Sequence, residues 1–555
     1  MAQFKKATLA LALAALAKAA VIPRNSTVGT SPACDVVDAL VPSFNGSVRT
    51  ILFDQAYKDA SIQRLAGAVQ IPTVVGDNNP DPLVDPDFYS EFVRLHEYLN
   101  ETFPLVRQNL ELETINGFGL LYTWRGSNPN LKPILFTSHQ DVVPVNNDTI
   151  DEWKFPPFSG HYDNETDSVW GRGSFDVKNL VIGQMEAVEK LLEDGYQTER
   201  TVLLAFGFDE EASGIWGARF ISQYIEQEYG QNGVMVMFDE GAGLVEVDAG
   251  SYIAVIPNAE KGYLDGIVAV NGQGGHSSSP PKHTTIGVAS DMITQLENNP
   301  SGVEFDVQNP LFGFLTCAAQ YSSQLPMSLK QLIFAAPANQ TAEAMLAQLL
   351  YSTDLTTDYV KTSQAVTIFH GGVKVNSIPE TSEFYVNHRI AQGSSVAETK
   401  ERFLYYANAT ANKFGYGLIA EGVTLIEPTK LGYINITYNS RPLEPSPVSP
   451  SSGPTWDLLT GTVQNLFVND FWKEQGLNNY TVATASGMVT GNTDSKHYWN
   501  VTDTIYRFIG GVTDPAISSL MHSVNEHVTM ETHLQSVAFV YEFIVNANEY
   551  GSTIN

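Results

Sequence analysis

Cysteine is nearly absent from this sequence. The 555 residues include only 2 cysteines, Cys34 and Cys317. Two cysteines cannot build the disulfide framework that holds small secreted domains together, and the sequence leaves open whether they form a bond. Stability must therefore come from a buried core or from bound metal. A hydrophobic content of 43% in a chain of this length is sufficient for two or more domains.

Basic residues are also scarce. The chain has 31 lysines and arginines against 61 aspartates and glutamates, which gives a formal net charge of −30 at pH 7. Such a charge repels phosphate backbones, so we predict no nucleic-acid partner. The acidity itself is typical of a well-solvated surface.

Long apolar runs are missing beyond the N-terminus. Two lysines precede the apolar run 7–17, and small residues follow it, which predicts a secretory signal peptide over residues 1–20. Because Lys18 interrupts the run before it reaches the ~20 apolar residues of a bilayer span, a permanent anchor is the weaker alternative and we expect no stable membrane span. Ten N-glycosylation sequons indicate a secretory-pathway protein, extracellular or vacuolar and N-glycosylated. They begin at Asn25, Asn45, Asn100, Asn147, Asn164, Asn339, Asn408, Asn435, Asn479 and Asn500.

The rest of the chain alternates predicted strands and helices. After a polar N-terminal arm over residues 21–50, residues 51–260 combine short apolar runs with amphipathic helices, which predicts a mainly parallel sheet covered on both faces. Residues 261–440 change to an α+β pattern and indicate an inserted domain, which we expect to be ferredoxin-like. The Pro- and Ser-rich residues 441–454 indicate a stiff linker. Residues 455–555 then complete the first domain, so the predicted fold class is α/β with a discontinuous main domain and an inserted α+β domain.

A histidine and an aspartate stand at the end of one apolar run. The run within residues 133–145 predicts a buried strand with His139 and Asp141 at its carboxyl end. Open α/β sheets bind ligands at such ends. Residues two apart on an extended chain point to the same side, so Asp141 can orient His139. Taken alone, the pair is equally typical of a histidine that is merely hydrogen-bonded at a strand end.

Four more carboxylates and one more histidine are further candidate ligands, and most of them also stand at the ends of predicted strands or turns. Asp176 lies in a glycine-rich turn that lacks the spacing of a phosphate-binding loop, Glu210 and Glu211 follow a second buried strand, Asp239 ends a third, and His522 belongs to the returning segment. Each carboxylate alone could be a helix cap. Imidazoles and carboxylates without thiolates suit Zn²⁺. Two histidines and three carboxylates can hold two ions if one carboxylate bridges them.

Together with further motifs, these residues resemble a known family. The motifs are Ser-His-Gln-Asp-Val-Val-Pro-Val (138–145), Trp-Gly-Arg-Gly-Ser-Phe-Asp-Val-Lys (170–178), Phe-Asp-Glu-Glu (208–211), Gly-Gly-His-Ser-Ser (274–278), Val-Asn-Ser-Ile-Pro-Glu (375–380), Asn-His-Arg-Ile (387–390) and His-Ser-Val-Asn-Glu (522–526). Their order from about Leu40 to the C-terminus is similar to that of the di-zinc metallopeptidases that include aminoacylase, carnosinase and glutamate carboxypeptidase. The resemblance is strongest to the carboxypeptidase S or Gly-Xaa carboxypeptidase branch. Val177 stands where many relatives have a second acid.

The resemblance implies a role for each candidate metal ligand. Asp176 would bridge two zinc ions, His139 and Asp239 would complete one site, and Glu211 and His522 would complete the other.

The resemblance also implies the catalytic and substrate-binding residues. Glu210 would be the general base, Asp141 would orient His139, and His276 would stabilise the oxyanion from its own subunit or from a partner's. Arg389 and Asn376 would hold the substrate's carboxylate.

These roles imply a zinc-dependent carboxypeptidase that acts on short peptides of the Gly-Xaa type. An N-acyl-amino-acid amidohydrolase is the alternative, because both substrates present an amide beside a free carboxylate. A non-catalytic binding relative is a further alternative. The inserted domain would be a lid and a contact in a homodimer.

Overall fold

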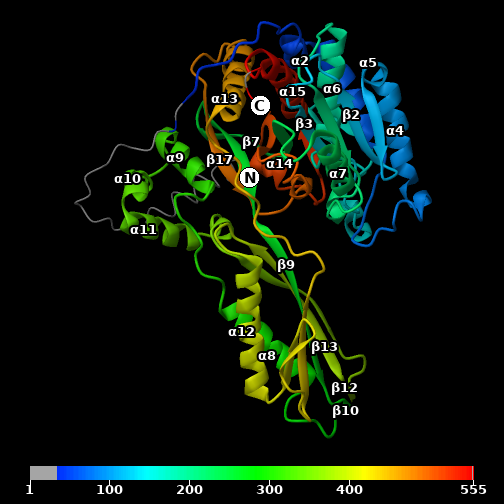
Figure 1. The fold of residues 1–555 in the computed structure, drawn as a ribbon, viewed down its shortest axis with the longest axis vertical. Coiled ribbons are helices and arrows are strands. Elements are labelled where there is room, and N and C mark those ends of the chain that lie inside the picture. Colours follow the sequence, from blue (N-terminus) through cyan, green and yellow to red (C-terminus); the bar gives the residue numbers. More distant parts are fainter. Residues whose placement is uncertain (1–33, 35, 553, 555) are drawn as a thin grey trace.

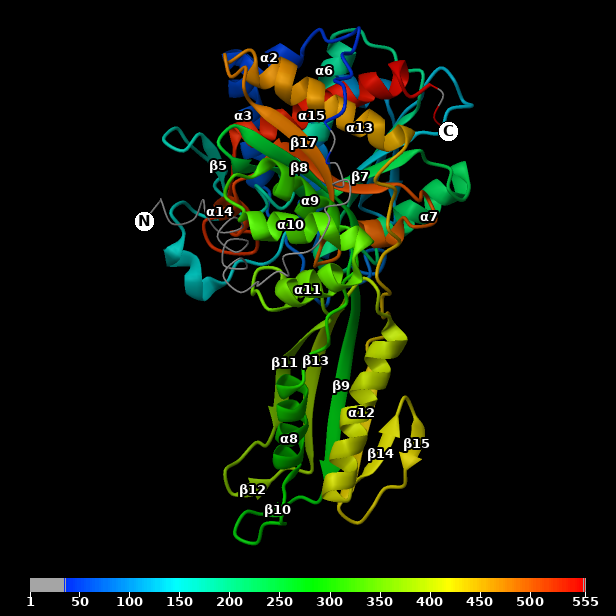
Figure 2. The same ribbon diagram turned by 90° about the vertical axis from the view of Figure 1, so that its left-hand side faces the viewer.

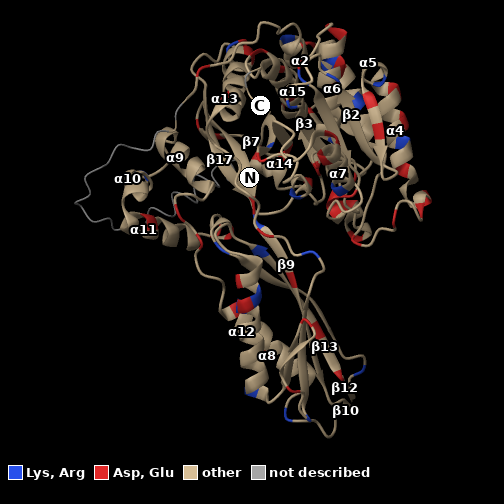
Figure 3. Ribbon diagram, viewed as in Figure 1, with Lys and Arg blue, Asp and Glu red and all other residues tan. Residues whose placement is uncertain are grey.

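The computed structural model describes residues 34, 36–552 and 554 and contains two domains. A larger domain carries most helices, and a narrower domain projects from it (Figure 1). The predicted signal peptide and the sequon at Asn25 lie outside the described residues. Acidic residues are spread over both domains (Figure 3). Within the described part of the chain, no helix is both long and apolar enough to cross a membrane.

An 8-stranded mixed sheet is the centre of the larger domain. The strand order is β1-β2-β6-β3-β7-β8-β17, and β18 pairs with β7. β3 runs parallel to β6 and β7, whereas β1 and β2 form an antiparallel edge. The strands are β1 (Glu111–Ile115), β2 (Gly119–Trp124), β3 (Ile134–His139), β6 (Val202–Gly207), β7 (Val236–Asp248), β8 (Ser251–Glu260), β17 (Thr481–Val489) and β18 (Ile505–Val512).

Helices cover both faces of this sheet, as predicted. In β6, Val202 and Leu204 face the core that includes α6 and α15, whereas Leu203 and Ala205 face α7. Burial on both faces explains why these strands are continuous apolar runs. The helices are α2 (Val48–Phe53), α3 (Gln55–Val69), α4 (Ser90–Thr102), α5 (Pro104–Asn109), α6 (Lys178–Glu193), α7 (Ala218–Tyr229), α13 (Pro454–Gln464), α14 (Pro515–Ser518) and α15 (Met530–Glu549).

Shorter elements connect these parts. A 3-stranded sheet joins β4 (His161–Asp163), β5 (Ser168–Trp170) and β19 (His527–Thr529). The short helical turns of this domain are η1 (Pro86–Tyr89), η2 (Asn147–Glu152), η3 (Glu210–Ala212), η6 (Asn465–Trp472) and η7 (Asp494–His497).

The projecting domain has a second sheet of 6 strands in the order β11-β13-β9-β16-β14-β15. The domain has the βαββαβ arrangement of a ferredoxin-like domain, formed by β9, α8, β11, β13, α12 and β16 in chain order. The four strands of this arrangement pair antiparallel. Apolar residues of α8 and α12 pack on one face of the sheet. The elements are β9 (Gly262–Gly272), β10 (Gly275–His276), α8 (Thr285–Asn298), β11 (Ser363–Gly371), β12 (Ser377–Ile378), β13 (Thr381–Ile390), α12 (Val396–Phe414), β14 (Gly417–Ala420), β15 (Val423–Ile426) and β16 (Gly432–Tyr438).

The stretch predicted as one inserted domain, residues 261–440, is divided in the structure. Its middle part, α9 (Leu311–Tyr321), α10 (Met327–Ala335), η4 (Ala336–Ala338), α11 (Gln340–Tyr351) and η5 (Thr357–Tyr359), packs below the larger domain (Figure 2). Side chains of α9 share a core with Ile253 of β8 and Ala483 of β17. The sequence does not indicate that this part packs on the larger domain, because α9, which makes the contact, is apolar over most of its length and has no clear polar face.

The two cysteines form a disulfide bond, a point that the sequence left open. Cys34 of the N-terminal arm is bonded to Cys317 of α9. The following residues of the arm lie on the larger domain, where the Leu40 amide donates to the carbonyl of Gly461 at 3.0 Å.

The predicted linker over residues 441–454 lies along β8. The Ser446 amide donates to the Glu260 carbonyl at 3.0 Å, and the Ser449 amide donates to the Asn258 carbonyl at 2.9 Å. Proline prevents this segment from becoming a full ladder strand, yet these two amides still pair with β8.

Candidate metal centre and active site

Most of the predicted ligands meet at one edge of the larger sheet. β3 ends at His139, η3 begins at Glu210 directly after β6, and Asp176 ends the turn that precedes α6. His522 comes from the loop between α14 and β19. The parallel strands β3 and β6 end at this edge, and β7 passes it at Asp239 and Glu240 before it continues to Asp248, which brings residues far apart in the sequence into one site.

Asp176 lies between the two predicted histidine ligands. Its Oδ1 is 3.3 Å from Nε2 of His139, and its Oδ2 is 3.0 Å from Nε2 of His522. The same nitrogen of His522 is 3.0 Å from Oε1 of Glu211. One carboxylate that presents each oxygen to a different imidazole has the arrangement of a bridging ligand.

Asp141 supports both His139 and the acidic pair. The Nδ1 of His139 is 3.0 Å from the Asp141 carbonyl oxygen and 3.4 Å from its Oδ1. The Asp141 carboxylate also accepts hydrogen bonds from the amides of Glu210 at 3.1 Å and Glu211 at 3.0 Å. Asp141 therefore fixes the orientation of the imidazole and of the turn that carries the acids.

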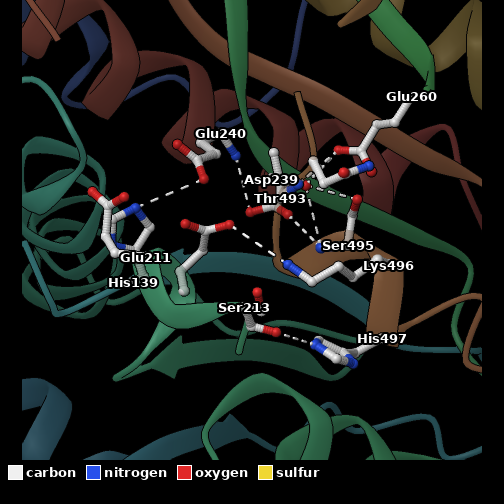
Figure 4. Close-up of polar contacts among 12 residues, drawn as sticks. His139, Glu211, Ser213, Asp239, Glu240, Glu260, Thr493, Ser495, Lys496 and His497 are labelled. Carbon is white, nitrogen blue, oxygen red and sulfur yellow. Dashed lines mark hydrogen bonds and ion pairs between the residues drawn. The ribbon is translucent and has the colours of Figure 1, made fainter. Parts of the chain in front are cut away.

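The structure differs from the sequence-based expectation at Asp239. Its carboxylate accepts hydrogen bonds from the amides of Glu240 and Ser495, each at 3.0 Å, and it does not join the cluster. Glu240 faces the cluster instead, with Oε1 3.7 Å from Nε2 of His139 (Figure 4). Adjacent residues of a strand point to opposite faces, so a one-residue error exchanges the two carboxylates. In this structure Glu240, and not Asp239, therefore lies beside the other candidate ligands.

The protonation of this site reflects crowded carboxylates in a buried setting. Burial raises the pKa of Glu210 to about 8 and holds the pKa of Glu240 well above its usual range. Burial opposes ionisation of Asp176 as well, yet hydrogen bonds from His139 and His522 lower its pKa. Hydrogen bonds to Asp176 and Glu211 raise the pKa of His522 to about 10.

The donor set fits divalent metal. Ligand atoms of His139, Asp176 and Glu211 lie within 4.8 Å of one another, as do those of His139, Glu210 and Glu240. Two imidazoles among several buried carboxylates provide both the negative charge and the nitrogen ligands that Zn²⁺ binds. The residues therefore fit a two-metal centre.

Glu526 holds the turn that carries Asp176. Its side chain is only 1% exposed and forms an ion pair with the buried guanidinium of Arg172. Its Oε1 accepts hydrogen bonds from the amides of Gly173 at 2.9 Å, Phe175 at 3.1 Å and Asp176 at 3.2 Å. Because Glu526 follows His522 by four residues, it fixes the position of Asp176 relative to His522.

Replacing Glu526 with alanine should destabilise the protein. The change leaves the Arg172 cation buried without its partner and three amides without an acceptor, which is expected to cost about 3–5 kcal/mol. Urea unfolding of the wild type and of the Glu526→Ala variant measures the difference in their free energies of unfolding. The matched control is Glu474→Ala, which removes the exposed ion pair with Arg49 and should change stability by less than about 1 kcal/mol. Equal losses in the two variants would contradict the role of Glu526.

The predicted oxyanion residue lies far from this centre within one chain. His276 is exposed in β10, which pairs with β12 at the end of the projecting domain (Figure 1). Its Nδ1 accepts a hydrogen bond from the Ser278 amide at 3.1 Å. Asn376 lies beside it, since the Ser277 amide donates to the Asn376 carbonyl at 3.2 Å.

Arg389 lies at the opposite end of the same domain. Its Nη1 donates to Oδ1 of Asn492 at 2.9 Å, and its guanidinium lies 4.9 Å from the centre of the Tyr263 ring. From Thr381 to Arg389 the strand β13 rises about 26 Å. One chain therefore does not bring Arg389 and Asn376 to the same carboxylate, contrary to the simplest form of the sequence-based expectation.

Sequence reasoning missed three residues of this region: Glu240, Lys496 and Glu526. The Asp239-Glu240 pair within β7 offered two candidates, and only the pleat of the strand selects between them. The last residue of the motif at 522–526 was part of the resemblance but had no assigned role. Lys496, whose Nζ is 3.8 Å from Oε1 of Glu210, had no sequence signal.

Comparisons with known proteins show which family this chain is similar to. The pattern of Peptidase family M20/M25/M40 matches residues 135–546. Carboxypeptidase S of Saccharomyces cerevisiae is 51% identical over 521 residues, which cover 94% of this chain and 90% of that protein. N-fatty-acyl-amino acid synthase/hydrolase PM20D1 of Mus musculus is 30% identical over 508 residues, 90% of each chain.

Solved structures show the same fold. Human carnosine dipeptidase 1 has a TM-score of 0.61 at 12% identity, covering 92% of this chain and 100% of that chain. The metallo-carboxypeptidase Sso-CP2 from Sulfolobus solfataricus has a TM-score of 0.58 at 16% identity, covering 87% of this chain and 98% of that chain. The site geometry and the extent of the family match lead to one conclusion: the chain belongs to Peptidase family M20/M25/M40.

Proposed function

We propose that the protein is a zinc-dependent carboxypeptidase that releases the C-terminal amino acid from short peptides of the Gly-Xaa type. The observation that carries the proposal is Asp176, whose two oxygens face His139 and His522 beside a buried glutamate pair. The similarity to carboxypeptidase S over nearly the whole chain supports the reaction class.

Two zinc ions would be held by residues of the cluster. His139, Glu240 and Asp176 would hold one ion, and Asp176, Glu211 and His522 would hold the other. When bound, zinc supplies a Lewis acid and makes water easier to deprotonate.

The remaining chemistry belongs to side chains of this protein. The Glu210 carboxylate would accept a proton from the attacking water and pass it to the leaving amine nitrogen as the carbon–nitrogen bond breaks. The guanidinium of Arg389 would bind the free carboxylate of the substrate through two parallel hydrogen bonds, which selects the terminal residue. Asp141 keeps the Nε2 of His139 directed into the site.

We propose further that a second copy of the chain completes the site. His276 and Asn376 are exposed at the far end of the projecting domain, so they would reach the metal centre of the other copy in a homodimer. There the His276 of the second copy would donate a hydrogen bond to the oxyanion of the tetrahedral intermediate. Asn376 of that copy would meet the substrate carboxylate bound by Arg389.

Passage through the secretory pathway, ending outside the cell or in a vacuole, is proposed as well. The bond between Cys34 and Cys317 supports it, since disulfides persist in oxidising compartments. None of the nine described sequon asparagines is buried, so their side chains are accessible to glycosylation.

An N-acyl-amino-acid amidohydrolase is the second candidate function. The similarity to N-fatty-acyl-amino acid synthase/hydrolase favours it, because such a substrate also carries an amide next to a free carboxylate. Arg389 would bind both substrates in the same way.

The test is release of leucine from N-blocked Gly-Leu beside release from N-acetyl-leucine. We expect peptide cleavage that disappears on chelation and returns with zinc. Faster cleavage of N-acetyl-leucine would favour the second candidate. No cleavage of either substrate by the zinc-loaded protein would overturn both and favour a binding relative.

A further inference from the structure

Lys496 points toward the proposed general base, Glu210, from a turn that many hydrogen bonds hold in place. The turn η7 follows Thr493, whose side chain accepts a hydrogen bond from the Ser495 amide at 3.3 Å. His497 closes the other end, with Nε2 2.9 Å from the Ser213 carbonyl oxygen in the turn after Glu211. Figure 4 shows Lys496 directed from this turn toward the centre of the site.

Three strands of the main sheet hold the turn. Glu260 at the end of β8 accepts hydrogen bonds from the Thr493 hydroxyl at 2.7 Å and from its amide at 3.1 Å. Asp239 of β7 accepts from the Ser495 amide at 3.0 Å. Arg507 of β18 pairs with Glu260 at 2.7 Å and donates from Nη2 to the Ser495 hydroxyl at 2.8 Å. These groups are buried, so the backbone of the turn has little freedom.

The Lys496 ammonium therefore has a fixed place next to Glu210. Its Nζ is 3.8 Å from Oε1 of Glu210, and the two side chains are only 12% and 10% exposed. An ammonium and a carboxylate at this distance, both shielded from solvent, attract each other. The lysine thus attracts this carboxylate toward the turn.

Glu210 has a competing arrangement within the same site. One carboxylate oxygen of Glu210 lies within 4.8 Å of ligand atoms of both His139 and Glu240. These three residues together could hold a metal ion. A glutamate bound to metal in that way shares its negative charge with the cation, which makes its carboxylate a weaker proton acceptor.

We propose that Lys496 is a positioning residue that holds Glu210 out of metal coordination and so keeps it available as a base. The inference deepens the proposed function and rests on it. It also gives Asp239 a role that differs from the predicted one, because Asp239 holds the turn that carries Lys496.

The first test compares Lys496→Met with the zinc-loaded wild type. We expect kcat on N-blocked Gly-Leu to fall by about tenfold to a hundredfold with KM nearly unchanged, because the base is displaced but substrate contacts remain. Lys496→Arg should recover most of kcat, since it restores a cation at the same place. Lys473→Met, which removes an exposed lysine of the same C-terminal segment, is the matched control and should leave kcat unchanged.

Two more measurements separate positioning from a structural effect. Adding Lys496→Met to Glu210→Gln should cause no further loss, because the lysine acts through the glutamate. The visible spectrum of the Co²⁺-loaded Lys496→Met variant should be weaker than that of the wild type, because an additional carboxylate ligand raises the coordination number.

The opposite results are equally informative. A rise in KM with kcat intact would show that Lys496 binds the substrate, and an unchanged Co²⁺ spectrum would show that Glu210 does not move; either overturns the proposal. If Lys496→Met does not fold, Lys496→Gln replaces it in the kinetic and spectroscopic tests. The Co²⁺ spectrum of Lys496→Arg, which keeps the cation, is then compared with that of Lys496→Gln. If the zinc-loaded wild type cleaves neither N-blocked Gly-Leu nor N-acetyl-leucine, the proposed function is rejected instead.

Discussion

Glu210→Gln is expected to lower kcat by about 10²–10⁴-fold while metal binding and KM change little. Glutamine has nearly the same shape as glutamate but cannot accept the proton of the attacking water. The side chain is largely buried, with Oε1 facing the Lys496 ammonium at 3.8 Å, so solvent cannot readily replace it as a base. Steady-state kinetics on N-blocked Gly-Leu and metal analysis of the purified variant measure the two quantities.

The control for this prediction is Glu211→Gln. Glu211 Oε1 is 3.0 Å from Nε2 of His522, so this residue is expected to act as a ligand rather than a base. Its loss should weaken metal binding, and added zinc should recover part of the activity. A Glu210→Gln variant that keeps wild-type kcat would refute the assignment of the base, and one that recovers activity with excess zinc would identify Glu210 as a ligand.

Mixed dimers should restore activity that each parent variant lacks. His276→Ala and Glu210→Gln homodimers are both expected to be nearly inactive. If the His276 of one copy serves the metal centre of the other, half of the randomly formed dimers are mixed, and one of the two sites in each is intact. The mixture should therefore reach about one quarter of wild-type activity.

The experiment uses co-expression of the two variants with different affinity tags. In the matched control, the Glu210→Gln chain is co-expressed with a chain that carries both His276→Ala and Glu210→Gln. No dimer in this mixture contains an intact Glu210, so the mixture should stay inactive. If the protein proves to be a monomer, or if the mixture shows no gain, completion of the site by a second copy is refuted. The metal centre and the proposed base would be unaffected by that outcome.

The elements that can be predicted from the sequence are those with a clear period. The helices α6 and α12 and the strand β16 have such a pattern in the sequence. The helix α9 was missed because it is apolar over most of its length and so lacks an amphipathic pattern.

The sequence also determines the composition of the site. His139 and Glu211 meet because they follow neighbouring parallel strands of the main sheet, whose ends share an edge. Asp176, in the turn before α6, and His522, in the loop before β19, are brought to the same edge. The resemblance to metallopeptidases assigns roles to them. Residues whose roles depend only on local order, such as Asp141 beside His139, are therefore predictable.

Only the tertiary structure decides which atoms face each other. The pleat of β7 directs Glu240 to the cluster and Asp239 to the turn at Ser495, a choice that adjacent carboxylates leave open in a sequence. The length of β13 separates Arg389 from Asn376. The contact between Lys496 and Glu210 joins residues nearly three hundred positions apart through a turn held by three strands. Such contacts depend on how separate elements pack, and a linear pattern contains no signal for that packing.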